Sequence, residues 1–178
     1  MHHLGKITTL GVVLGLVVLA LVGLNLKHNF ANPQAETRLI SGVNQATSGL
    51  GVNGILFDTT RAEITINDQP ATVEDLAPGM VVALSTTMEP SGKVGWAREI
   101  VVDSLLTGPV MATEIADDGT GALDVLGQVV QVDAGTVFAS RNPDISSTRA
   151  LDKGTLVEVH GFSSGDGQLL ATRIDVFD

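Results

Sequence analysis

The sequence predicts an all-β protein made of two tandem small β-barrels that follow a single N-terminal transmembrane helix. From Gly42 onward, short alternating runs are separated by Gly, Asp, Asn and Ser without a sustained helical period, as in all-β folds. The segments Asp75–Leu84 (DLAPGMVVAL) and Ala150–Val159 (ALDKGTLVEV) repeat one pattern, and an uncharged apolar run precedes both. The predicted order is a tail (1–6), a membrane anchor (7–26), a polar linker (27–41) and two repeats (42–105 and 106–178).

The apolar run Ile7–Leu26 is long enough to cross a membrane. Its 20 uncharged residues would span roughly 30 Å as a helix, at about 1.5 Å per residue. A cleavable signal peptide is the alternative. The candidate cleavage points after Ala31 and Ala35 have Asn29 and Pro33 at the −3 position, which fits a signal peptidase site poorly. We therefore expect a retained signal anchor with the long acidic remainder facing outward; cleavage would instead give a secreted protein.

Gly11 and Gly15 form a G-x-x-x-G pair inside this run. Such a pair lets two membrane helices approach closely, so it predicts a helix-packing contact. Small residues are also common in membrane spans of every kind, and that interpretation stays open.

The repeated segments predict how each barrel is closed. Leu76 and Leu151 are expected to plug one end of their barrel. Gly79 and Gly154 supply a backbone conformation that residues with a Cβ avoid, where the next strand begins. A short sheet gains stability by closing, because closure removes its exposed edges.

The remaining parts of the repeats align in blocks that predict an insertion. Ile64–Ile66 matches Leu123–Val125 at an offset of 59 residues, whereas Leu76 matches Leu151 at an offset of 75. The second repeat would then hold 16 extra residues within Asp133–Arg149.

The polar loop in this segment, SRNPDISSTR, supplies the candidate binding residues Arg141, Asn142 and Arg149. Loops on rigid scaffolds often carry binding side chains. The alternative is a solvated connector whose arginines pair with Asp144 and Asp152.

Composition argues against several functions. From Glu36 onward the chain carries 8 basic and 20 acidic residues, a formal charge of −12 that disfavours nucleic-acid binding. There is no cysteine, and His160 is expected on the solvated face of a strand, so Ser-His-Asp and Cys-His triads are not expected.

The segment Asp117–Gly119 lacks the spacing of an EF-hand calcium loop and predicts a hairpin turn. Trp96 is expected in the core or at a partner contact, with the core favoured. We expect no metal, cofactor or enzymatic activity.

Three phrases resemble a known bacterial family: VNGILFDTTRAEITINDQPATVEDLAPGMVV, LTGPVMATEIADDGTGALDVLGQVVQVDAGTVF and GDGQLLATRIDV. The resemblance, over about Ser48–Asp178, is to the tandem repeats of domain of unknown function five-six-six-six. It implies small OB-like β-barrels in exported or envelope-attached proteins, with no catalytic residues and no known ligand. Members commonly carry a lipoprotein cysteine, which this chain lacks, so the membrane helix is expected to serve instead.

Anchor, repeats and resemblance together predict a single-pass protein of the bacterial inner membrane, with its β-domains in the periplasm or outside. Its expected role is a binding or assembly module for a protein partner or for self-association. The alternative is a structural subunit of an extracellular or envelope assembly joined through β-edges.

Overall fold

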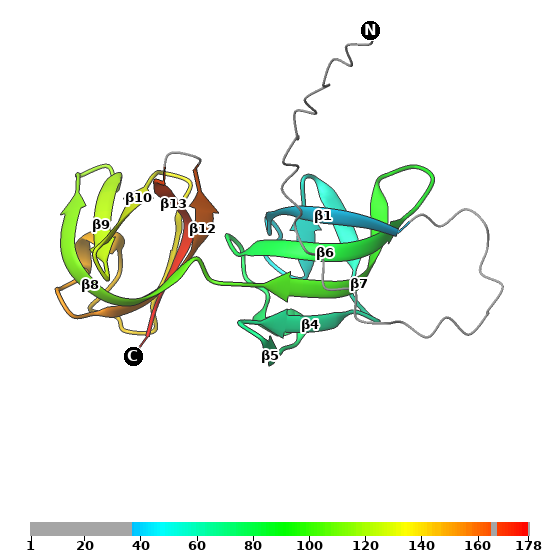
Figure 1. The fold of residues 1–178 in the computed structure, drawn as a ribbon, viewed down its shortest axis with the longest axis horizontal. Helices are drawn as coiled ribbons and strands as arrows, with labels where there is room; N and C mark the ends of the chain where they lie inside the picture. Colours follow the sequence, from blue (N-terminus) through cyan, green and yellow to red (C-terminus); the bar gives the residue numbers. More distant parts are fainter. Residues whose placement is uncertain (1–36, 165–166, 178) are drawn as a thin grey trace, which may run out of the picture. The chain divides into compact units, whose positions relative to one another are not determined.

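The computed structural model describes residues 37–164 and 167–177, which are drawn in colour in Figure 1. The described residues form strands and two short 3-10 helices, so the predicted all-β class is confirmed. No helix among them is both long and apolar enough to span a bilayer. The predicted anchor Ile7–Leu26, with Gly11 and Gly15, lies outside the described residues.

The first sheet is built around the long β6–β7 hairpin. β1 pairs antiparallel with β6, and β7 pairs in parallel with β3 along one stretch and with β4 along the next. β2 and β3 form a hairpin, and the isolated bridge Asn44–Val52 links β2 to the end of β1. The first sheet is therefore closed by one bridge rather than by a strand ladder, which falls short of the closed barrel predicted. Its strands are β1 (Thr37–Val43), β2 (Leu50–Val52), β3 (Ile55–Asp58), β4 (Glu63–Ile66), β5 (Gln69–Pro70), β6 (Val81–Met88) and β7 (Val94–Val102).

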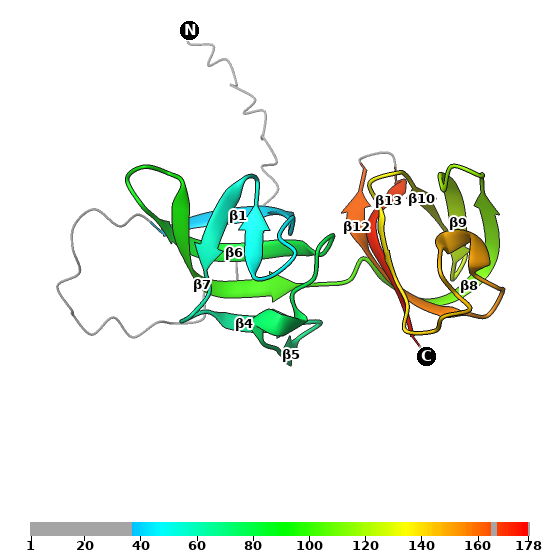
Figure 2. The ribbon, with the colours of Figure 1, turned by 180° about the vertical axis from the view of Figure 1, so that it is seen from behind.

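The second sheet repeats this arrangement with a more continuous ring. β8 pairs with β9 and β12, β12 with β13, and β10 with both β9 and β13, so five strands are hydrogen-bonded in a circle (Figures 1 and 2). β11 adds to β13 in parallel, as β4 adds to β7. Its strands are β8 (Leu106–Ile115), β9 (Gly121–Val125), β10 (Gln128–Val132), β11 (Val137–Ala139), β12 (Leu156–Ser163) and β13 (Leu169–Val176).

The strand register corrects the alignment of the two repeats. Ile64 pairs with Ile100, and Phe138 pairs with Ile174, so the counterpart of Ile64 is Phe138, 74 positions later. Leu123 instead belongs to β9, the counterpart of β2. Because this offset nearly equals that between Leu76 and Leu151, the predicted 16-residue insertion does not exist. Several strands alternate apolar and polar residues with the same period and end in similar turns. The alignment therefore matched Ile64–Ile66 with the wrong strand of the second repeat.

Each sheet packs around its own apolar core. Leu76 is 4% exposed in the first core and Leu151 is 4% exposed in the second, as the plug interpretation requires. Each leucine follows a 3-10 helix, η1 (Val73–Asp75) or η2 (Thr148–Ala150). The Asp75 carboxylate accepts hydrogen bonds from the backbone and hydroxyl of Thr72, at 2.8 Å each, so it stabilises the turn before Leu76 rather than the one after it.

The first sheet begins earlier than the sequence predicted. β1 starts at Thr37, inside the segment 27–41 that was expected to be a linker. Most of β1 is exposed on both faces, so it lacks the alternation of buried residues that identifies other strands. β7 ends at Val102 and β8 begins at Leu106, so residues 103–105 connect the two sheets.

Candidate functional site

A pocket opens on the first sheet where β7 changes its parallel partner. β3 pairs with β7 up to Trp96, and β4 pairs with it from Glu99 onward. The chain between β3 and β4 leaves the sheet over residues 59–62, so β7 has no parallel partner at Ala97 and Arg98. The resulting pocket has a volume of about 740 Å³, within the usual range for ligand sites. We call it the Trp96 pocket; it is lined by Asp58, Thr60, Arg61, Thr87, Trp96, Ala97 and Arg98.

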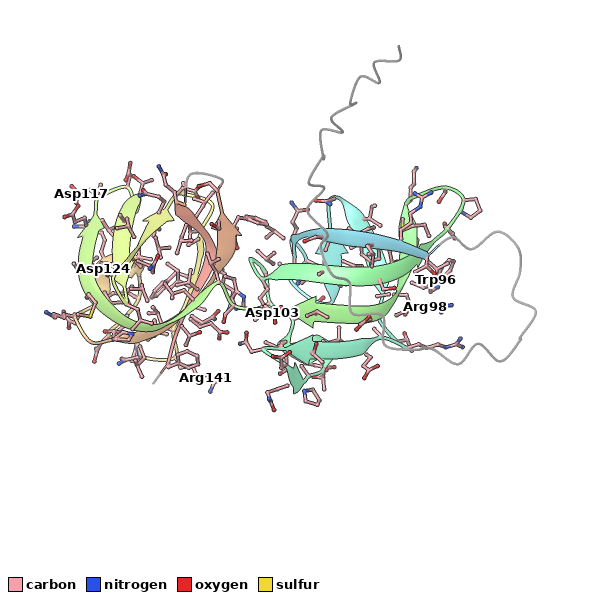
Figure 3. The ribbon with its side chains drawn as sticks, in the orientation of Figure 1. Trp96, Arg98, Asp103, Asp117, Asp124 and Arg141 are labelled. Atoms are coloured by element: carbon pink, nitrogen blue, oxygen red, sulfur yellow. The ribbon has the colours of Figure 1, made fainter. Side chains whose placement is uncertain are left out.

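A β-bulge directs Arg98 into this pocket. In the antiparallel ladder between β6 and β7, Ser85 pairs with Glu99 and Thr86 with Ala97, so Arg98 is the extra residue. Bulges often re-aim a side chain at a functional surface. Figure 3 shows Arg98 beside Trp96, toward the end of β7 that is remote from Asp103.

Trp96 is the main apolar surface of the pocket. Its side chain lies on the outer face of β7 and is 44% exposed, so the favoured prediction of a core position is wrong. The neighbouring Leu56 and Val94 are paired across β3 and β7 and are exposed on the same sheet. A half-exposed tryptophan with adjacent aliphatic side chains is typical of the anchor in a binding surface.

The pocket combines this apolar surface with charges of both signs. Among the described residues, neither Arg61 nor Arg98 has an ion-pair partner. Hydrogen bonds from the side chain and backbone of Thr60 hold the pKa of Asp58 below its ordinary value, so this carboxyl stays ionised. Asp58 therefore adds a negative charge to a pocket that also holds Arg61 and Arg98.

The second repeat has a corresponding site, and there a turn of the first repeat is bound, with a pocket of about 430 Å³ left beside it. Thr172 is the extra residue of the bulge between β12 and β13, because His160 pairs with Arg173 and Gly161 with Ala171. Its hydroxyl donates to the Gly79 carbonyl at 2.6 Å, and Arg173 Nη1 donates to the Pro78 carbonyl at 2.9 Å. A turn of the first repeat therefore lies on the surface of the second that corresponds to the Trp96 pocket. We call the turn Ala77–Met80 the Gly79 turn.

Comparison with protein families identifies this second repeat. Residues 107–175, from β8 to β13, match the family described as "Domain of unknown function (DUF5666)". The second repeat is a DUF5666 domain. Comparisons with curated proteins and with solved structures found no match. The Trp96 pocket lies in the first repeat, outside the matched residues, whereas the surface that receives the Gly79 turn lies within the DUF5666 domain.

His160 of the DUF5666 domain is buried where the repeats meet, which corrects the prediction of a solvated residue. Strand alternation does put it on the outer face of β12, opposite the core residue Val159, but its side chain is fully covered. Neither ring nitrogen has a hydrogen-bond partner among the described residues. Burial lowers the pKa of His160, while the carboxylates of Glu158 and Asp175, 3.9 and 4.0 Å from Nε2, oppose that shift.

The three predicted binding residues of the DUF5666 domain are not gathered into one site. Arg149 forms a 2.9 Å ion pair with Asp117, rather than with Asp144 or Asp152. Arg141 lies at the other end of the domain from Asp117 (Figure 3). The Asn142 side chain accepts a hydrogen bond from the Asp144 backbone at 3.0 Å, which shapes its own turn.

The acidic turn of the DUF5666 domain is a hairpin, as the sequence predicted. Residues 116–120 connect β8 to β9, and Ala116 and Thr120 are hydrogen-bonded across the turn at 2.8 Å. The Asp118 carboxylate accepts hydrogen bonds from Thr120. In the part of the chain that the structure describes, no group of three or more His, Asp or Glu side chains could hold a metal ion.

The sequence carried one signal for the Trp96 pocket that composition alone did not reveal. Trp96 and Arg98 stand two positions apart on a strand, with Arg61 in the preceding loop, in an otherwise acidic chain. Alternation would place both β7 residues on one face. The bulge and the change of parallel partner, which create the cavity, depend on pairing between distant segments and have no local signature.

Proposed function

We propose that this protein is a non-enzymatic binding and assembly module of the bacterial cell envelope. In this proposal, Ile7–Leu26 is a signal anchor in the inner membrane, and the two sheets are small OB-like β-barrels in the periplasm or outside. The uncharged length of the apolar run supports the anchor. The circular strand pairing of the second sheet, and the bridge that links β1 to β2 in the first, support the barrels.

The observation that carries the binding role is the open Trp96 pocket. It presents a half-exposed tryptophan and two arginines without ion-pair partners among the described residues. Tryptophan and arginine are the side chains most enriched at the energetic centres of protein interfaces. The equivalent surface of the second repeat holds a turn of the chain through two hydrogen bonds, which supports a protein segment as the natural occupant of such a site.

Site-specific photo-crosslinking in cells tests this binding role. A photoreactive amino acid at Thr60, inside the pocket, should give discrete adducts, because a bound partner would contact that position. The same group at Thr120, a half-buried threonine between β8 and β9 of the other repeat, is the control. The adducts at Thr60 should fall to the control level when Trp96 is replaced by Leu. Adducts that persist unchanged in Trp96→Leu would refute a role for the pocket.

Membrane fractionation tests the location separately. After an alkaline carbonate wash, the full chain should remain in the membrane pellet. Protease added to spheroplasts should digest it. Release into the soluble fraction with loss of the N-terminal residues would instead support secretion after signal cleavage.

A further inference from the structure

We propose that the Trp96 pocket binds the exposed glycine turn of the second repeat from another copy of this chain. That turn, residues 152–155, is called the Gly154 turn. The contact would reproduce between two molecules the contact that already joins the two repeats within one molecule. The inference rests on the proposed binding role of the pocket and specifies the occupant.

The two glycine turns are structurally equivalent. The Gly79 N–H donates to the Asn44 carbonyl at 2.9 Å, and Asn44 N–H donates to the Met80 carbonyl at 2.8 Å. Gly154 N–H donates to the Val110 carbonyl at 2.8 Å, and Val110 N–H donates to the Thr155 carbonyl at 2.8 Å. Both glycines have positive φ, +88° and +95°. The turns therefore present their carbonyl groups outward in the same way.

Only one of the two equivalent turns is covered. Gly79 is buried, and a Cβ there would lie 2.7 Å from the Thr172 carbonyl oxygen. Gly154, Asp152 and Lys153 are all exposed, and nothing lies within 4 Å of a Cβ built on Gly154. The chain thus displays a second docking turn that nothing in the described residues covers.

The receiving sites correspond as well, and only that of the second repeat has a glycine turn bound to it. Arg98 in the first repeat and Thr172 in the second are the extra residues of corresponding bulges. Thr172 donates to the docked turn and is partly covered, whereas Arg98 is exposed. Next along the strand, Arg173 is buried against Pro78 while its counterpart Glu99 is exposed. Each molecule therefore has one receiving site without a bound turn and one uncovered turn.

The chemistry of the open pocket fits the Gly154 turn. Arg98 can donate to a carbonyl of the turn, as Thr172 does to Gly79. In the turn, Lys153 stands where the first repeat has Pro78. In the receiving site, Glu99 stands where the second repeat has Arg173. The positive charge of Lys153 would therefore face the negative charge of Glu99. Neither Asp152 nor Lys153 has an ion-pair partner among the described residues. Contacts between different surfaces of identical chains are heterologous and generate rings or open chains.

Disulfide crosslinking between separately tagged copies tests the contact. The chain has no cysteine, so each variant carries one thiol. Full-length Arg98→Cys and Lys153→Cys chains, co-expressed in membranes and oxidised, should form a mixed dimer, because a disulfide needs Cα atoms within about 7 Å. Arg141→Cys paired with Lys93→Cys is the control, since both positions are exposed and charged. We expect a yield at least about tenfold above that control.

The direction of the contact has its own readout. Arg98→Cys alone and Lys153→Cys alone should dimerise no more than the control, because a head-to-tail contact brings unlike positions together. A mixed dimer at the control level, or equal dimers from each single variant, would overturn the inference. If that result came with Trp96-dependent photo-adducts at Thr60 to a different protein, the pocket would still bind a partner. If those adducts were also independent of Trp96, the proposed function would fail too.

Discussion

The Gly79 turn and the Gly154 turn have the same backbone and the same position in their repeats, yet one is buried and the other is exposed. The difference lies in what covers them, since Thr172 and Arg173 of the second repeat bind the first turn. Repetition in this chain therefore does more than duplicate a fold. It places a turn and a receiving site in each copy, and one of each remains unused inside the molecule.

The largest effect is expected from adding one methyl group to each turn. Gly79→Ala puts a Cβ 2.7 Å from the Thr172 oxygen and 2.8 Å from the Arg173 Cβ. Overpacking of about 1–3 kcal/mol adds to a left-handed backbone cost of about 1–2 kcal/mol. We expect the free energy of unfolding to fall by about 3 kcal/mol, measured by urea unfolding of the full chain.

Gly154→Ala is the matched control, because it shares the positive φ but meets no atom within 4 Å. It should lower the free energy of unfolding by about 1 kcal/mol, from the backbone term alone. Equal losses in the two variants would show that the contact between the repeats does not contribute to stability.

The second effect concerns Asn44, which shapes the covered turn. Its fully buried amide donates to the Ala77 and Gly49 carbonyls, at 3.3 Å each, and accepts from Ala46 and Gly51, at 3.1 Å each. Val110 holds the corresponding place in the second repeat with an apolar side chain. Asn44→Val should cost about 2 kcal/mol, because buried backbone groups lose their partners.

Asn142→Val is the comparison for Asn44→Val. Asn142 is only partly buried, and its side chain serves one exposed turn. Its replacement should change the free energy of unfolding by no more than about 0.5 kcal/mol. A loss as large as that of Asn44→Val would contradict the special role assigned to the buried amide.

The third effect is a dependence of stability on pH. Burial lowers the pKa of His160 below its ordinary value of 6.5, so the unfolded chain takes up the proton first as the pH falls. Stability should therefore decline below about pH 6.5, by up to about 1.4 kcal/mol per pH unit. The equivalent position of the first repeat is Ser85, which does not titrate there. Urea unfolding measured from about pH 7 down to about pH 5 tests this slope.

His160→Phe keeps a ring at this position and removes the titration. The variant should show a shallower decline in stability over the same pH range, whatever its absolute stability. An unchanged slope would mean that burial and the carboxylates of Glu158 and Asp175 cancel at His160, and a steeper decline would mean that the carboxylates outweigh burial.

Much of the fold was predictable from the sequence because it depends on local patterns. Val82 and Leu84 alternate with other residues on β6, as Val157 and Val159 do on β12, and all four side chains are buried, as the two-residue period of a strand predicts. Gly79 and Gly154 were correctly placed in a conformation that favours glycine. Each of these features is determined by a residue and its near neighbours in the sequence, so it can be predicted without knowing the tertiary structure.

The candidate site was not predictable, because it depends on contacts between distant segments. Arg98 reaches the pocket through a bulge in β7, and His160 is buried because the outer face of its strand is covered at the junction of the repeats. The predicted insertion failed for the same reason, since β4 and β9 look alike as sequences and differ only in their partners. Arg141, Asn142 and Arg149 were chosen for lying in that supposed insertion.

The smallest effect is expected at these predicted residues, and it decides which repeat binds. The Arg149–Asp117 pair is exposed, with side-chain exposures of 50% and 96%, and exposed pairs contribute little. The double variant Arg141→Ala with Arg149→Ala should therefore change the free energy of unfolding by no more than about 0.5 kcal/mol, and leave photo-crosslinking from Thr60 intact.

The comparison variant is Trp96→Leu, which installs the residue that the second repeat has at Leu170. It should abolish that crosslinking with equally little loss of stability. If the arginine variant abolished partner capture and Trp96→Leu did not, binding would belong to the DUF5666 domain and the open pocket of the first repeat would have no role in it.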